Sequence, residues 1–171
     1  MIIRKATIKD TEKLADLYHE FYSTHKNMGK FWLPSWAPKD AKNFGDFVKA
    51  KEVKKHLVGE AIDAVTKYKS TFLFVAEENK QVVGFVSFYI EKNISWFRVK
   101  KYGFIDECCV LKKFRGKGIA RELIEFAESN LKKKGIDYVM LKTSIGNKNS
   151  QQTWEHLGYK KELYVQIKEL K

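Results

Sequence analysis

The stretch YGFIDECCVLKKFRGKGIARELIEFAESNLKKKG, residues 102–135, decides the fold of this chain. Its first part, FIDECCVL, has the composition of a buried strand, interrupted by Asp106 and Glu107. RGKG then turns the chain, because Gly116 and Gly118 can adopt backbone dihedrals that other residues avoid. In the remainder, apolar residues recur at every fourth position, which predicts an amphipathic helix closed by a final glycine.

A strand that feeds a glycine loop at the start of a helix gathers unpaired backbone N–H groups, and these attract anions. The loop lacks the P-loop pattern, and the dinucleotide pattern GxGxxG fails at Arg121. The remaining pattern, Arg115-x-x-Gly118-x-Ala120, resembles the acetyl-CoA loop of the GCN5-related N-acetyltransferase (GNAT) superfamily. In that family the loop amides hold the CoA pyrophosphate. The alternative is a strand-to-helix turn without a ligand.

A second resemblance lies near the end of the chain. DYVMLKTSI predicts a strand parallel to the first, which completes a βαβ unit. The following NKNSQQTWEHLGYKKELYVQIKEL resembles the closing signature of the same family, with Asn147 in the asparagine place, Trp154 in the tyrosine place, and Gly158 and Tyr159 replacing Gly-Phe before a final strand. Because both signatures occur at the expected separation, the chain is identified as a member of the GNAT superfamily.

The resemblance implies an α/β (α+β) fold, the GNAT fold, in which helices on both faces flank a mixed, mostly antiparallel central sheet of six or seven strands. The length of 171 residues and a hydrophobic content of 44% fit a single N-acetyltransferase domain over residues 1–171. Acetyl-CoA is expected in a V-shaped gap between the strand holding Cys108 to Val110 and the strand holding Met140 to Thr143.

The rest of the chain predicts elements typical of such a domain. We expect a strand at residues 2–4, a helix capped by Asp10, a helix weakened at Gly59 between residues 46 and 68, and a hairpin of TFLFVAEE and VVGFVSFYIEK. The loop at residues 23–43 is rich in aromatic residues. These either pack on the core or line an acceptor pocket, as this region does in the family; they are Phe31, Trp32 and Trp36.

Acetyl transfer needs a base that takes a proton from the amine and donors that stabilise an oxyanion. A desolvated carboxylate on a strand has a raised pKa suited to the first task, so Asp106 and Glu107 are both candidates. Asp106 matches the glutamate that family members acting on polyamines are thought to use. Strand alternation places it on the face of Cys108 and Val110, with Glu107 on the other face, so we prefer Asp106.

The resemblance also assigns the cofactor contacts. Backbone amides near Cys109 and Val110 would bind the pantetheine arm and the thioester carbonyl. The predicted cofactor-binding residues are Cys108, Cys109, Val110, Arg115, Gly116, Lys117, Gly118, Ile119, Ala120, Asn147 and Trp154. No metal site is predicted, because the two adjacent cysteines point to opposite faces of a strand.

Two positions depart from the family pattern. Trp154 stands where most members place a tyrosine that protonates the leaving thiolate, and an indole N–H does not ionise usefully. Tyr159 or Tyr164 could replace it, or the CoA thiolate could leave unassisted. Lys142 stands where members that acetylate protein N-termini tend to have glutamate, which argues against N-terminal or ribosomal-protein acetylation.

The formal net charge of +12 favours polyanionic partners, and CoA is itself a polyanion. The basic residues form no block of five, and no nucleic-acid-binding motif accompanies them, which argues against a nucleic-acid partner. No apolar run suits a membrane span or a signal peptide, so a cytoplasmic protein is expected. A homodimer is compatible with these features.

The sequence therefore predicts transfer of the acetyl group of acetyl-CoA to a primary amine, on a small molecule such as a polyamine or on a protein lysine. The basic surface argues against a strongly cationic acceptor unless local acids line its pocket. The alternative from another class is a non-catalytic acetyl-CoA-binding regulatory module, which Trp154 favours. A nucleic-acid-binding protein is a third hypothesis, which requires salt-sensitive binding of DNA or RNA.

Overall fold

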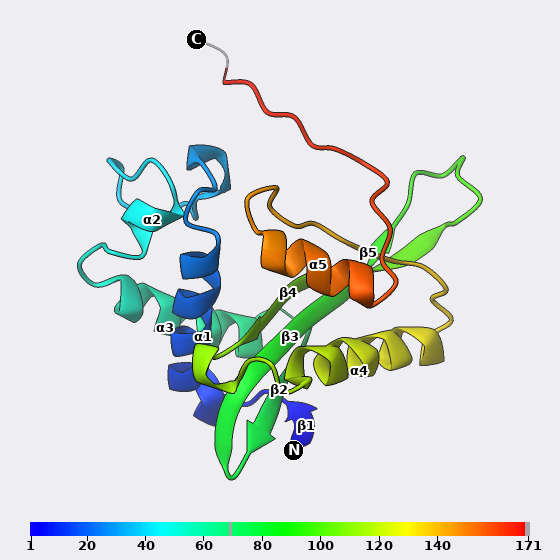
Figure 1. Cartoon of the computed structure of the whole chain (residues 1–171), viewed down its shortest axis with the longest axis horizontal. Coiled ribbons are helices and arrows are strands. Elements are labelled where there is room, and N and C mark those ends of the chain that lie inside the picture. Colours follow the sequence, from blue (N-terminus) through cyan, green and yellow to red (C-terminus); the bar gives the residue numbers. More distant parts are fainter. Residues whose placement is uncertain (69, 170–171) are drawn as a thin grey trace.

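A mixed sheet runs through the middle of the computed structural model, which describes residues 1–68 and 70–169 (Figure 1). Within those residues the sheet has five strands in chain order: β1 (Ile2–Lys5), β2 (Phe72–Glu78), β3 (Gln81–Lys92), β4 (Lys101–Val110) and β5 (Val139–Leu141). The first four pair antiparallel, and β5 is parallel to β4. The expected mixed, mostly antiparallel sheet is confirmed.

The expected number of six or seven strands is wrong, because the described residues form five. The strand predicted at the end of the chain is not formed: residues 160–169 have no regular structure, are exposed and extend away from the body (Figure 1). An extended segment leaves its backbone groups unpaired unless a neighbouring strand accepts them, and residues 160–169 have no such neighbour. The predicted strand after the glycine-loop helix is also shortened, to the three residues of β5.

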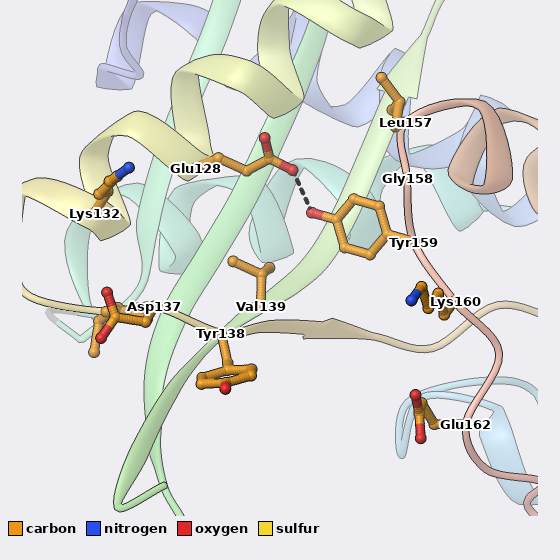
Figure 2. Close-up of a pocket in the computed structure, with 11 residues that line it drawn as sticks. Glu128, Lys132, Asp137, Tyr138, Val139, Leu157, Gly158, Tyr159, Lys160 and Glu162 are labelled. Carbon is orange, nitrogen blue, oxygen red and sulfur yellow. Dashed lines mark hydrogen bonds between the residues drawn. The ribbon is translucent and has the colours of Figure 1, made fainter.

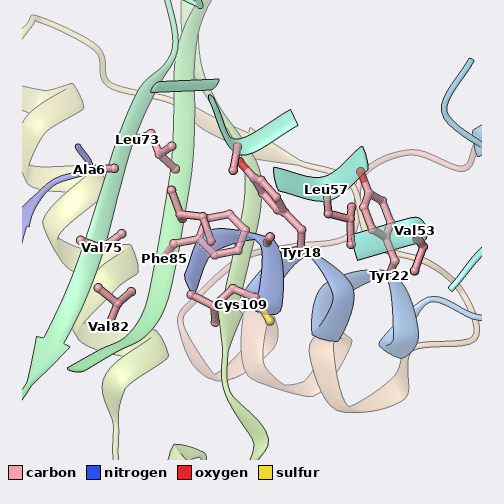
Figure 3. Close-up of a cluster of buried hydrophobic side chains, with 14 of the residues drawn as sticks. Ala6, Tyr18, Tyr22, Val53, Leu57, Leu73, Val75, Val82, Phe85 and Cys109 are labelled. Atoms are coloured by element: carbon pink, nitrogen blue, oxygen red, sulfur yellow. The ribbon is translucent and has the colours of Figure 1, made fainter. Parts of the chain in front are cut away.

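Helices cover both faces of the sheet, as expected. On one face lie α1 (Thr11–Thr24), the short α2 (Phe44–Phe47) and α3 (Val53–Thr66), with a core that includes Tyr18, Phe85 and Cys109 (Figure 3). On the other face lie α4 (Ile119–Lys133) and α5 (Lys148–His156). The helix expected between residues 46 and 68 is divided in two, because Glu52 adopts a left-handed φ of 67°.

The expected hairpin is formed by β2 and β3. Asn79 and Lys80 occupy its turn with φ values of 50° and 62°, the pattern of a type I′ turn that matches the twist of the strands. In the loop after α1, Trp32 and Trp36 pack against the core under α1 and α3, whereas Phe31 is exposed. The loop also contains a short 3₁₀ turn, η2 (Lys30–Trp32).

The packing of α4 on the sheet depends on one glycine. A Cβ on Gly103 of β4 would lie 2.4 Å from Leu131 Cδ1, so only glycine permits this approach. The stripe of α4 is fully buried on the sheet at Leu123, Ala127 and Leu131. This contact holds the last turn of α4 against the start of β4, and residues 111–118, which include the glycine loop, join the other ends of the two elements.

Candidate active site

Strand β4 has partners on both sides only along its first half. Its pairing with β5 ends where Ile105 lies opposite Leu141, whereas its pairing with β3 continues to Val110. Among the described residues, no strand pairs with residues 106–110 on the side of β5. The two strands therefore part in the region where the sequence resemblance expects acetyl-CoA.

The loop after β4 presents free amides at the start of α4. Gly116 and Gly118 have φ values of 77° and 82°, and a Cβ on either would meet no atom within 4 Å, so their role is conformational. In the part of the chain that the structure describes, the N–H groups of residues 116–120 have no acceptor. The first bond of α4 runs from the Glu122 N–H to the Gly118 carbonyl at 3.1 Å. Such a row of amides can bind an anion.

The side chain of Arg115 supports this loop from behind. Its Nε donates to the Val110 carbonyl at 2.9 Å, and its Nη2 donates to Glu20 Oε1 on α1 at 2.6 Å. Arg115 thereby links the end of β4 to α1. The ammonium groups of Lys113 and Lys117 lie over the Phe114 ring at 5.0 and 5.4 Å, which leaves positive charge at the outside of the loop.

Several predicted cofactor residues offer only their backbone to a ligand. The side chain of Cys109 packs in the core under α1 and α3, and those of Cys108 and Val110 pack under α4. Burial raises the pKa of both thiols, that of Cys109 to about 12, so neither is a ready thiolate. Ile119 is likewise buried, at the first turn of α4.

A β-bulge in β4 changes which way its two acids face. Ser87 of β3 lies opposite Glu107 and Phe88 lies opposite Ile105, so Asp106 is the extra residue. Ile105 and Cys108, three positions apart, consequently pack in the same core under α4. The expectation that simple alternation places Asp106 on the face of Cys108 and Val110 is therefore wrong. A one-residue bulge breaks the alternation of period two on which it was based.

Glu107 faces a polar group in the core under α1 and α3. Glu60 belongs to α3, on the same face of the sheet, and its Oε1 accepts a hydrogen bond from the Tyr22 hydroxyl at 3.1 Å. Ser87 lies next to Glu107 across the strands and is only 4% exposed. Among the described residues, neither the Ser87 hydroxyl nor Glu60 Oε2 has a hydrogen-bond partner, although both atoms are buried. Buried polar atoms without partners are rare in native proteins and often mark a functional site.

The pKa values of the three carboxyl groups are all raised. Burial raises the pKa of Glu107 well above its usual value, and the charges of Asp106 and Glu60 raise it further. Burial also raises the pKa of Glu60, against the opposing effect of the Tyr22 hydrogen bond. For Asp106 burial raises the pKa and the charge of Lys142 lowers it. In all three groups the surroundings favour the protonated form more than water does.

No basic side chain in the described residues forms an ion pair with Asp106, Glu107 or Glu60. This is notable in a chain with 33 lysines and arginines against 21 acids. Among the described residues, Lys142 acts electrostatically on Asp106, and Glu107 and Glu60 are left without a paired basic residue. Such an arrangement favours a cation from outside the protein.

Two residues of the closing signature, Asn147 and Trp154, form hydrogen bonds within the first turns of α5. Asn147 caps the helix, since its Oδ1 accepts from the Ser150 N–H at 3.1 Å, and its Nδ2 lies 3.4 Å from His25 Nε2 at the end of α1. The Trp154 indole N–H donates to Ser150 Oγ at 3.0 Å. Their side chains therefore position the turn between β5 and α5.

Neither tyrosine considered as a replacement acid lies beside Asp106, Glu107 and Glu60. The Tyr159 hydroxyl donates to Glu128 of α4 at 2.7 Å, on the other face of the sheet (Figure 2). Burial and that bond raise the pKa of Tyr159. Tyr164 is exposed in the segment that extends from the body. The structure thus brings Asp106 and Glu107 together with Glu60, and separates Tyr159 from them.

Sequence reasoning missed Glu60 and Ser87. A signal for Glu60 was present, because it follows Leu57 by three positions and precedes Ala64 by four, which places a carboxylate on the apolar stripe of α3. Ser87 interrupts an otherwise apolar strand and is the one polar residue in VVGFVSF. Neither position, read alone, indicated that the two would meet Glu107.

The chain matches the Acetyltransferase (GNAT) family over residues 12–159 and belongs to that family. N-alpha-acetyltransferase 30 of Schizosaccharomyces pombe is 30% identical over 88 residues, which are 52% of this chain and 57% of that protein. The matched part thus spans little more than half of the length of that relative.

Two solved structures share the fold. A tetramutant of the BH1408 protein from Bacillus halodurans has a TM-score of 0.75 and 20% identity, over 99% of this chain and 100% of that chain. Aminoglycoside N-acetyltransferase AAC(6')-Iy in complex with CoA has a TM-score of 0.70 and 18% identity, over 99% of this chain and 93% of that chain.

Two further properties concern the whole described chain. None of its described helices combines the length and the apolar character needed to cross a membrane. Nor do three His, Cys, Asp or Glu side chains gather there in the way that a metal site requires.

Proposed function

We propose that this protein transfers the acetyl group of acetyl-CoA to a primary amine of a small cationic molecule, such as a polyamine. The observation that carries the proposal is the course of β4. Its second half bears two acids on an edge without a strand partner and leads directly into a loop of free amides. A polyanionic thioester and a protonated amine are the two substrates that such a pair of features suits.

The cofactor end of the site is the loop. The amides of residues 116–120 would hold the pyrophosphate, with Lys113 and Lys117 adding charge from outside. Acetyl-CoA supplies an acetyl group activated as a thioester. The unpaired edge of β4 near Cys109 and Val110 would receive the pantetheine arm through its backbone groups.

We assign the base to Asp106. It follows directly on the last residue of β4 that pairs with β5, so it lies where the strands part. Its side chain has access to solvent, although the protein atoms around it partly desolvate the carboxyl group. A base must be ionised and reachable when the ammonium form of the acceptor arrives. The raised pKa of Asp106 suits removal of that proton, whereas Glu107 is more deeply buried and holds a proton more tightly.

Glu107 and Glu60 would then bind the rest of the acceptor. A second ammonium group placed between them would donate a hydrogen bond to Glu60 Oε2, and its charge would take the place of a basic side chain. This assignment predicts a preference for diamines and polyamines over monoamines. It also fits a basic protein, because the acids attract the cation locally although the remaining surface repels it.

A non-catalytic acetyl-CoA-binding module is the second candidate. Trp154 favours it, because its indole N–H is bound to Ser150 and cannot protonate a leaving thiolate. In that case acetyl-CoA would bind without turnover. The similarity to an N-alpha-acetyltransferase adds peptides with free N-termini to the acceptors that need testing.

The test measures acetyl-CoA binding by calorimetry and CoA release with a panel of monoamines, diamines, polyamines, aminoglycosides, lysine peptides and free N-terminal peptides. We expect saturable binding and the highest kcat/KM for acceptors with two or more ammonium groups. If acetyl-CoA binds but no acceptor causes release of CoA, the protein is a non-catalytic acetyl-CoA-binding module.

The matched variants in this test are Gly118→Val and Gly29→Val. Gly118 requires a left-handed φ, whereas Gly29 has an ordinary extended φ and open space around its Cα. We expect Gly118→Val to weaken acetyl-CoA binding at least about tenfold and Gly29→Val to leave it unchanged. Undiminished binding by the Gly118 variant would show that the loop does not hold the cofactor.

A further inference from the structure

The hairpin that joins β3 to β4 projects beyond the sheet and exposes apolar side chains at its tip (Figure 1). Its sequence from residue 92 to residue 101 is KNISWFRVKK. Trp96 is 78% exposed, Ile94 is 51% exposed and Phe97 is 48% exposed. Apolar side chains that gather at one exposed place mark surfaces that contact a protein or a membrane.

Hydrogen bonds within the hairpin hold its tip in one shape. The Asn93 N–H donates to the Lys100 carbonyl at 2.8 Å, and the Phe97 N–H donates to the Ile94 carbonyl at 3.0 Å, which closes a turn. Trp96 lies within that turn, and the centre of its ring is 6.4 Å from the centre of the Phe97 ring. The apolar side chains are therefore carried by a preformed turn, so a partner can bind them with little further ordering of the chain.

The same hairpin carries a concentration of positive charge. Residues 92–101 contain no acid and four basic residues, Lys92, Arg98, Lys100 and Lys101. All four are exposed, and within residues 1–68 and 70–169 none of them forms an ion pair. Lys92 lies directly opposite Lys101 in the pairing of β3 with β4, and like charges at opposed positions destabilise a sheet. An anionic partner would relieve this repulsion.

The end of α4 adds charge near the base of the hairpin. Leu131 packs against Gly103 at the start of β4, so the lysines that follow it, residues 132–134, lie at the end of the sheet from which the hairpin projects. Two exposed acids, Glu91 and Asp137, offset part of this charge. The basic side chains of the two segments outnumber them, so this end of the molecule is electropositive.

We propose that the hairpin binds an anionic lipid surface. Trp96, Phe97 and Ile94 enter the interfacial region of the bilayer, where tryptophan is enriched, and the basic side chains lie against the negatively charged headgroups. Contact of this kind lies at the surface of the bilayer and does not require a helix that spans it. The proposal is independent of acetyl transfer, because the glycine loop follows Val110 at the opposite end of β4.

Two other occupants suit these side chains less well. A second copy of the chain would bring the basic residues of two tips together, and like charges repel. A nucleic acid would match the charge and could stack on Trp96 and Phe97, but it offers no apolar surroundings for Ile94. An anionic bilayer offers both the charge and the apolar region.

Sedimentation with lipid vesicles tests the proposal. One set of vesicles is phosphatidylcholine alone, and the other is phosphatidylcholine mixed with phosphatidylserine. We expect the protein to bind the mixed vesicles, to bind phosphatidylcholine at least about tenfold more weakly, and to dissociate at high salt. Arg98→Glu and Trp96→Ser should each weaken binding to the mixed vesicles at least about tenfold. Since both side chains are exposed, the variants keep their fold.

The matched controls are Lys80→Glu and Phe31→Ser. Lys80 is an exposed residue in the turn at the other end of β3, and Phe31 is 69% exposed in the loop after α1. They make comparable changes of charge and of apolar surface away from the hairpin, and should leave vesicle binding unchanged. Equal losses in the variants and the controls would overturn the proposal, because the whole surface rather than the hairpin would then determine binding.

Tryptophan fluorescence tests whether the tip enters the bilayer. Trp96 is one of four tryptophans, and because it is exposed its emission should move to shorter wavelength when mixed vesicles are added. Trp96→Phe should keep the binding and lose this shift. Three results would each contradict the proposal: no binding to mixed vesicles, binding without a shift that depends on Trp96, or tighter binding to a single-stranded oligonucleotide than to the vesicles.

Discussion

The cores on the two faces of the sheet differ in the buried polar groups that they contain. Under α4 the core is apolar, and Gly103 lets Leu131 approach β4 closely. Under α1 and α3 the core contains Glu107, Glu60 and Ser87, with buried oxygens that have no partner among the described residues. The buried oxygens under α1 and α3 would need a hydrogen-bond donor from outside the described residues, such as a bound ligand. The difference supports our proposal that the face under α1 and α3 binds the acceptor, whereas the packing of α4 stabilises the sheet.

The strongest test of this contrast removes the proposed base. Asp106→Asn should lower kcat by about 10²–10⁴-fold, because a positioned base contributes that much to proton transfer. The rise of kcat with pH should also disappear, since activity requires Asp106 to be ionised and its pKa is raised. Steady-state kinetics over a pH range measure both effects.

The control for Asp106→Asn is Glu91→Gln, an exposed acid at the far end of β3. It should leave kcat and the pH profile unchanged. Full activity of Asp106→Asn would show that Asp106 is not the base, even if the acids on this face bind the acceptor.

The face under α4 should respond in stability rather than in chemistry. Gly103→Ala forces Leu131 to move and should lower the free energy of unfolding by about 1–3 kcal/mol, as overpacking of a core does. Gly59→Ala is the matched control, because a Cβ there meets no atom and lies within α3. It should raise stability by about 0.5–1 kcal/mol. Urea denaturation measures both variants, and equal effects would mean that α4 does not pack as closely as described.

The smallest effect concerns the buried acid Glu107. Its pKa is raised in the folded protein, so the folded state binds its proton more tightly than the unfolded state does. The resulting stability is present at acidic pH, below the unfolded pKa, and is lost as pH rises through the folded pKa. Glu107→Gln should abolish this loss, so the variant should be more stable than the unmodified chain at pH values above the folded pKa of Glu107. Thermal unfolding over the pH range measures it, and parallel profiles for the two proteins would contradict the burial of this group.

Local sequence patterns predicted those parts of the fold that local interactions govern. The glycine loop needs Gly116 and Gly118 for their left-handed dihedrals, and both adopt them. The hairpin of β2 and β3 and the stripe of α4 also follow from short-range spacing. The family was identified from two such signatures, and the match over residues 12–159 confirms it.

Other features depended on contacts between distant residues. The bulge at Asp106 is a property of the pairing between β3 and β4, and a strand pattern read alone gives no sign of it. Arg115 stays a predicted cofactor contact, and no sequence pattern indicated that its side chain would reach Glu20, 95 positions earlier in the chain. The number of strands was overestimated because residues 160–169 have the composition of a strand but pair with no strand among the described residues.

The sequence by itself determined the strand, the anion-binding loop and the helix, because dihedral preferences and helical spacing act within a few residues. It also placed two acids on β4, and these suggested proton transfer from an amine to a carboxylate. Only the tertiary structure decided that Ser87 lies opposite Glu107 and that Glu60 shares their core, and that β5 is an edge strand of the sheet formed by residues 1–68 and 70–169. These depend on how helices and strands far apart in the chain are packed, and on which backbone groups that packing leaves without partners.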